Sequence, residues 1–69
     1  MELSARNQLT GTVTNVKLGT IMSEVAVDVG GQEIVSVITR GSVERMSIQP
    51  GDRVTVIIKS TEVMLGKED

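Results

Sequence analysis

The sequence contains no cysteine, no histidine and no aromatic residue. Without cysteine the chain forms no disulfide, and without cysteine or histidine it lacks the ligands of structural zinc sites. These absences also remove cysteine as a nucleophile and histidine, the commonest general base, and the acidic residues show no spacing that singles out a catalytic pair or a calcium loop. The sequence therefore argues against an enzyme, a metal site and a resident cofactor.

The chain has few residues with which to build a core. Its 69 residues are 39% hydrophobic, so residues 1–69 are expected to form one domain with a core of Val, Ile, Leu and Met. Domains of this size usually need disulfides, a metal or a partner subunit for stability. With the first two excluded, the sequence predicts an oligomer.

The charged residues give no sign of a polyanionic partner. Seven basic and nine acidic residues are scattered singly and leave a net charge of −2, which disfavours nucleic acid and anionic membranes. An OB-type barrel can bind single-stranded nucleic acid, but it does so through aromatic stacking platforms, which this chain lacks. The first residues lack the pattern of a secretory signal, and no segment is long enough to span a bilayer. We therefore expect a cytoplasmic protein.

Eleven Val and seven Thr favour β-structure. Alternation of apolar and polar residues predicts strands at 9–18, 21–29, 32–39 and 53–59, a short fifth strand at 63–65 and a solvated tail at 66–69. A shift of phase between Val13 and Val16 indicates a bend or bulge in the first strand. The pair Gly30-Gly31 predicts a tight hairpin, and the segment 49–52, with Pro50 and Gly51, predicts a turn.

Between residues 39 and 52 the alternation stops. Ser42 precedes Val43 as a possible N-cap, so one or two helical turns are expected there. The order of elements predicts an all-β fold, a small five-stranded OB-like Greek-key barrel with one short helical turn. An SH3-like barrel is the alternative. Ile57 falls on the outer face of its strand and would need cover from a partner, which again points to assembly.

Three clusters of hydroxyl and cationic residues lie at the ends of the expected elements, at residues 4–7, 39–42 and 59–61. A tetrahedral oxyanion of charge −2 is bound by such donors, with Arg6 and Lys59 able to neutralise it. Alternatively, the clusters serve only as caps and turns.

The string SARNQL at residues 4–9, with Gly11 and Val13, and the string IKSTEVM at residues 58–64 resemble the molbindins. These small molybdate-binding Mop proteins are related to TOBE domains. Thr39 and Ser42, three apart, and the turn at Gly51 also match that family, so the resemblance covers nearly the whole chain.

This resemblance implies an OB-like barrel that forms a homo-hexamer, a trimer of dimers, with molybdate or tungstate bound at subunit interfaces. The oxyanion contacts that carry over are Ser4, Arg6, Thr39, Ser42, Lys59 and Ser60. Because Ser4 and Lys59 lie near opposite ends of the chain, a site that takes these two motifs from different subunits is consistent with interface binding.

The function implied is storage or homeostasis of molybdenum. The alternative is a regulatory or scaffolding module that associates with a molybdate transporter or regulator.

Overall fold

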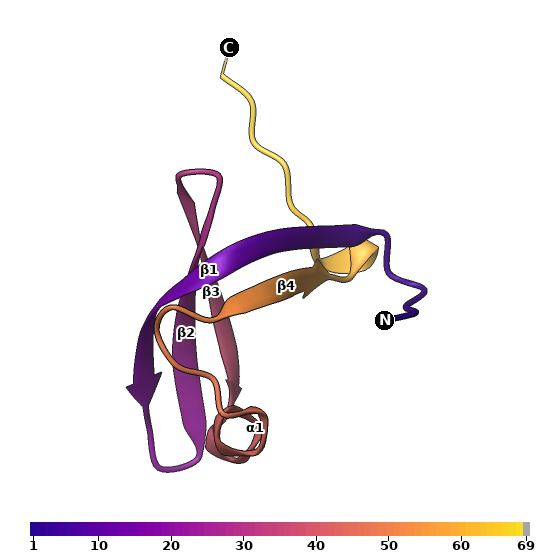
Figure 1. The fold of residues 1–69 in the computed structure, drawn as a ribbon. Helices are drawn as coiled ribbons and strands as arrows, with labels where there is room; N and C mark the ends of the chain where they lie inside the picture. Colours follow the sequence, from indigo (N-terminus) through magenta and orange to yellow (C-terminus); the bar gives the residue numbers. More distant parts are fainter. Residues whose placement is uncertain (69) are drawn as a thin grey trace.

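A single antiparallel sheet organises the chain. The computed structural model describes residues 1–68, and over these residues the elements are β1 (Asn7–Leu18), β2 (Met22–Val29), β3 (Gln32–Thr39), α1 (Arg40–Met46), β4 (Arg53–Ile58) and the 3-10 helix η1 (Ser60–Glu62) (Figure 1). The strands lie in the order β3-β2-β1-β4. The mostly-β prediction is confirmed; Asp69, the last residue of the expected domain and tail, lies outside the described residues.

Strand β1 is long, curved and shared between two partners. Its first half pairs with β4 from Asn7 to Thr12, and its second half pairs with β2 from Thr12 to Leu18. The register shifts between Val13 and Asn15, which leaves Thr14 as an extra residue, and the Thr14 hydroxyl donates to the Ala26 carbonyl at 3.3 Å. This bulge confirms the predicted bend, and Figure 1 shows β1 curving across the molecule at this region.

The predicted turns form as expected. Gly30 and Gly31 have positive φ, which a tight turn between β2 and β3 requires. In the turn before β4, Gly51 has φ +96°, and the Asp52 N–H donates to the Gln49 carbonyl at 3.2 Å. The turn also binds the bulge of β1, because the Gly51 N–H donates to a β1 carbonyl at 2.8 Å.

The core is aliphatic and lies on the inner face of the curved sheet, beneath α1. Its buried members are Val13 of β1, Val25 and Val27 of β2, and Val43 of α1. Partly buried residues complete it: Val16, Val29, Ile38, Ile48, Val54 and Val56.

Helix α1 begins earlier than the sequence predicted. Its N-cap is Thr39, whose hydroxyl accepts from the Ser42 N–H at 3.1 Å, so the predicted cap at Ser42 was wrong. The helix starts where β3 ends, because the Arg40 N–H donates to the Ile21 carbonyl of the neighbouring chain segment at 2.8 Å and turns the backbone there. It ends at Ser47, which adopts a left-handed conformation with φ 52°.

The fifth strand predicted at 63–65 is absent from the sheet formed by residues 1–68. After β4, which ends at Ile58 and not at Lys59, η1 turns the chain and the following segment leaves the body of the molecule (Figure 1). The residues Val63, Met64 and Leu65 are 46%, 90% and 95% exposed. The sheet of one chain therefore stays open, with β3 and β4 as edge strands.

Candidate functional site

The first and last donor motifs meet at one end of the sheet. Asn7 pairs with Ile58 in the outermost residue pair of the ladder between β1 and β4. Arg6 and Lys59 are the next residues outward on the two strands, and both side chains are exposed. Two cations from opposite ends of the sequence thus stand side by side on the backbone.

Local hydrogen bonds hold the backbone on both sides of this rung. On the N-terminal side, the Gln8 side-chain amide donates to the Ala5 carbonyl at 2.6 Å, next to Arg6. On the C-terminal side, Lys59 is the N-cap of η1 and its carbonyl accepts from the Glu62 N–H at 2.8 Å. Ser4 and Ser60, two of the three hydroxyl residues of these motifs, are exposed in the same segments. We call Ser4, Arg6, Lys59 and Ser60 the terminal cluster.

The middle motif forms a second group of donors at the start of α1. The Thr39 hydroxyl donates to Ser42 Oγ at 2.9 Å, and the Arg45 guanidinium approaches the same oxygen at 3.5 Å. Ser42 Oγ is therefore within hydrogen-bond distance of both side chains. We call Thr39, Ser42 and Arg45 the helix cluster.

Arg45 was not among the residues predicted from the sequence. Its link to Ser42 follows from helical spacing, since residues three apart lie on one face of a helix. Placing the start of the helix at residue 43 left Ser42 outside it, and so hid this pairing. The neighbouring Arg40 is engaged differently, in an exposed ion pair of 3.4 Å with Glu44, so Arg45 is the cation that faces the hydroxyl groups of this cluster.

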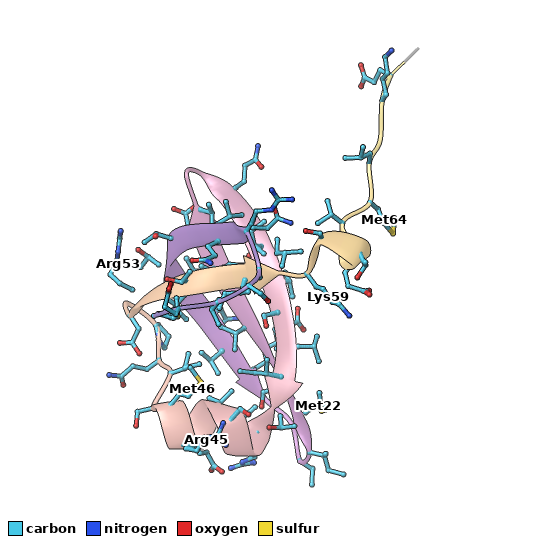
Figure 2. All side chains as sticks on the ribbon, turned by 90° about the vertical axis from the view of Figure 1, so that its right-hand side faces the viewer. Met22, Arg45, Met46, Arg53, Lys59 and Met64 are labelled. Carbon is cyan, nitrogen blue, oxygen red and sulfur yellow. The ribbon has the colours of Figure 1, made fainter. Side chains whose placement is uncertain are left out.

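The two clusters lie at opposite ends of the sheet. The terminal cluster adjoins the first residue of β1, whereas the helix cluster follows the end of β3, on the side where β1 ends at Leu18. Eleven strand steps at about 3.3 Å separate the ends of β1, or roughly 36 Å along the strand. Figure 2 shows Arg45 and Lys59 in these separate regions.

This placement revises the expected grouping of the motifs. The Ser4 motif and the Lys59 motif are neighbours within one chain, so different subunits are not needed to bring them together. Within one chain, Thr39 and Ser42 lie at the opposite end of the sheet from the terminal cluster.

Within the described residues, the acidic side chains form no group of three that could hold a metal ion. No helix formed by residues 1–68 is long and apolar enough to cross a membrane. The features that remain are clusters of cationic and hydroxyl donors on a small β-sheet domain, an arrangement suited to bind an anion.

Comparison with known protein families agrees with this class. The chain belongs to the TOBE domain family, whose model matches residues 3–65. Among curated proteins, it is 46% identical to molybdenum-pterin-binding protein 1 of Clostridium pasteurianum over 66 residues, which cover 94% of this chain and 97% of that protein. The resemblance to Mop proteins inferred from the sequence is confirmed.

Solved structures of similar proteins share the fold. A molybdate-binding protein from Sporomusa ovata is 40% identical, with a TM-score of 0.92 over 97% of this chain and 100% of that chain. The cytoplasmic molybdate-binding protein ModG, in a crystal form with molybdate bound, is 39% identical, with a TM-score of 0.83 over 87% of this chain and 43% of that one.

Proposed function

We propose that this chain is a cytoplasmic molybdate- or tungstate-binding protein that serves molybdenum storage or homeostasis. In this proposal it acts as a homo-hexamer, a trimer of dimers, with the oxyanion held at subunit interfaces. The observation that carries the proposal is the position of Arg6 and Lys59, directly beyond the last rung between β1 and β4. The location follows the similar protein ModG, which is described as cytoplasmic.

The terminal cluster has the composition that a tetrahedral dianion requires. Arg6 and Lys59 provide two positive charges, which match the charge of −2 on molybdate. The hydroxyl groups of Ser4 and Ser60 supply neutral donors beside them. Because the backbone on both sides is hydrogen-bonded, the donors are held near their binding positions before the ligand arrives.

The separation of the two clusters supports an interface site. If Thr39 and Ser42 also contact the oxyanion, they must come from another copy, since their own chain places them at the far end of the sheet. A neighbouring copy would at the same time exclude water from donors that are exposed in the single chain. Charge-assisted hydrogen bonds are stronger in such a water-poor environment.

The oxyanion, and not a pterin, is the ligand that these residues favour. The curated relative is named for a molybdenum-pterin, whose flat ring is most readily held by aromatic stacking. This chain has no Phe, Tyr or Trp with which to stack. Its clusters contain only hydroxyl and cationic donors, which suit the oxygens of molybdate or tungstate.

Sulfate has the same charge and shape, so the site must select by size. Donors fixed at the wider oxygen spacing of molybdate could not all reach the oxygens of sulfate, so sulfate would form fewer hydrogen bonds. A rigid interface between copies is a reasonable means of fixing that spacing.

Isothermal titration of the purified protein with molybdate, in buffer containing sulfate, tests the proposal, with light scattering of the same sample to measure its mass. We expect saturable binding by a hexamer. Absence of heat together with a monomeric mass would contradict the proposal. It would favour the alternative, a module that associates with a transporter or regulator, which a pull-down with and without molybdate would then examine.

A further inference from the structure

Arg45 carries a positive charge that no carboxylate neutralises within residues 1–68. The one ion pair in this part of the chain joins Arg40 to Glu44 at 3.4 Å. Arg45 lies in the last turn of α1, and its exposed side chain extends back toward the start of the helix, where its Nη2 lies 3.5 Å from Ser42 Oγ. The two arginines of α1 therefore differ, because one is paired with an acid and the other faces hydroxyl groups.

The contact between Arg45 and Ser42 fixes their hydrogen-bond roles. A guanidinium group has donors and no acceptor, so Ser42 Oγ accepts from Arg45 and the hydroxyl proton of Ser42 is directed away from that side chain. Thr39 holds Ser42 from the other side, since its hydroxyl lies 2.9 Å from Ser42 Oγ and accepts from the Ser42 N–H at 3.1 Å. The hydroxyl group of Ser42 is thus oriented by its neighbours before any ligand is present.

Arg45 also lies close to any anion that Ser42 binds. An oxygen that accepts from Ser42 Oγ lies about 2.7 Å from it, so the 3.5 Å contact places Arg45 Nη2 within about 6 Å of that oxygen. This is shorter than the distance over which salt screens exposed charges, about 8 Å at physiological ionic strength. One bond to Ser42 leaves the other N–H groups of the guanidinium available as donors.

We propose that Arg45 is a positioning residue of the oxyanion site: it orients the Ser42 hydroxyl and adds a third positive charge, after Arg6 and Lys59, beside the bound dianion. This inference rests on the proposed function, in which Thr39 and Ser42 of a neighbouring copy contact the anion. The competing role for Arg45 is structural, because a cation in the last turn also stabilises a helix end.

Isothermal titration with two anions separates these roles. Molybdate carries two negative charges, and perrhenate is a tetrahedral oxyanion that carries one. The variants are Arg45→Gln, which removes the charge, and Arg45→Lys, which retains it. Arg53→Gln is the matched control, because it removes the same charge from an exposed arginine at the start of β4, which Figure 2 shows in a different region from Arg45. Light scattering and urea denaturation of each anion-free variant measure its assembly and stability.

We expect Arg45→Gln to bind molybdate about tenfold more weakly than the natural chain, the lower end for loss of a charge-assisted hydrogen bond. Coulomb energy is proportional to the charge of the ligand, so perrhenate affinity should fall only about threefold. Arg45→Lys should recover most of the preference for the dianion. Arg53→Gln should resemble the natural chain with both anions.

Equal molybdate affinity of Arg45→Gln and Arg53→Gln would overturn the inference. An equal loss for the two anions would also overturn it, because a structural role does not depend on ligand charge. If perrhenate does not bind the natural chain, the stability measurements decide. Weaker molybdate binding with unchanged mass and unfolding free energy in Arg45→Gln supports the inference, and a parallel loss of stability rejects it.

The outcome for the proposed function is distinguishable from this one. A natural chain that does not bind molybdate would reject both the function and the role of Arg45. Binding that Lys59→Ala weakens and Arg45→Gln leaves unchanged would retain the function and reject the inference alone.

Discussion

Lys59 is the residue whose replacement tests the terminal cluster most directly. Lys59→Ala removes a charged donor and no core volume, since its side chain is exposed. Loss of one charge-assisted hydrogen bond costs about 1.5–3 kcal/mol, so molybdate affinity should fall about 10- to 100-fold in isothermal titration. Lys17→Ala is the matched control, because it removes the same charge from an exposed position in the second half of β1. Equal affinity of the two variants would contradict the assignment of Lys59.

Ser23 is a buried polar residue without a partner. Its side chain lies on β2 in line with Val25 and Val27 and is 3% exposed, yet its hydroxyl has no hydrogen-bond partner within residues 1–68. Burying an unpaired hydroxyl is unfavourable, so Ser23→Ala should raise the free energy of unfolding by about 1 kcal/mol in urea denaturation. Ser36→Ala, at a half-buried position of β3, is the comparison and should change stability less. A loss of stability in Ser23→Ala would be the contrary result.

At the scale of the elements, the cap of α1 gives a pair of variants with different outcomes. Thr39→Ala removes the hydroxyl that accepts from the Ser42 N–H, and loss of an N-cap costs about 1 kcal/mol. Ser42→Ala leaves that backbone donor in place and should cost clearly less. Thr39→Ser retains the hydroxyl and should restore most of the stability. Urea denaturation of the three variants measures these differences, and a larger loss in Ser42→Ala would favour the cap predicted from the sequence.

Local sequence signals identified most of the elements. The hairpin at Gly30-Gly31, the turn at Gly51 and the bend after Val13 depend on backbone preferences and alternation within a few residues, and all three form. The start of α1 was misplaced because it depends on a hydrogen bond from the Arg40 N–H to the carbonyl of Ile21, which is distant in sequence and lies in the turn between β1 and β2. The fifth strand at 63–65 did not form, because an apolar run indicates a strand without indicating which edge will receive it.

The candidate site was predictable as a set of residue types but not as an arrangement. Sequence motifs identified three clusters of donors, whereas their grouping in space depends on which strands pair. The rung between Asn7 and Ile58 brings the chain ends together, and the rung between Met22 and Thr39 places the middle motif at the other end of the sheet. The role of these residues in binding an oxyanion stays a prediction.

The whole molecule exposes more large apolar side chains than its small core contains. Beyond the tail, they include Leu9 of β1, Met22 of β2, Val35 and Val37 of β3, and Ile57 of β4. If assembly covers such residues, only folded chains can associate. The midpoint of thermal unfolding should then rise with protein concentration. Calorimetry over a roughly 100-fold range of concentration would measure this, and a constant midpoint would indicate a chain that is stable by itself.

The rung between Asn7 and Ile58 also has a consequence for the order of folding. It joins residues 51 positions apart, whereas the hairpin of β2 and β3 needs only the two residues between Val29 and Gln32. Closing a long loop costs more entropy and takes more time than closing a short one, so the hairpin should form first and the β1–β4 ladder late. During synthesis this ladder cannot form until β4 (Arg53–Ile58) has left the ribosome. Arg6 and Lys59 therefore come together only after Lys59 has been added, and a chain terminated before that residue would lack the pair of cations altogether.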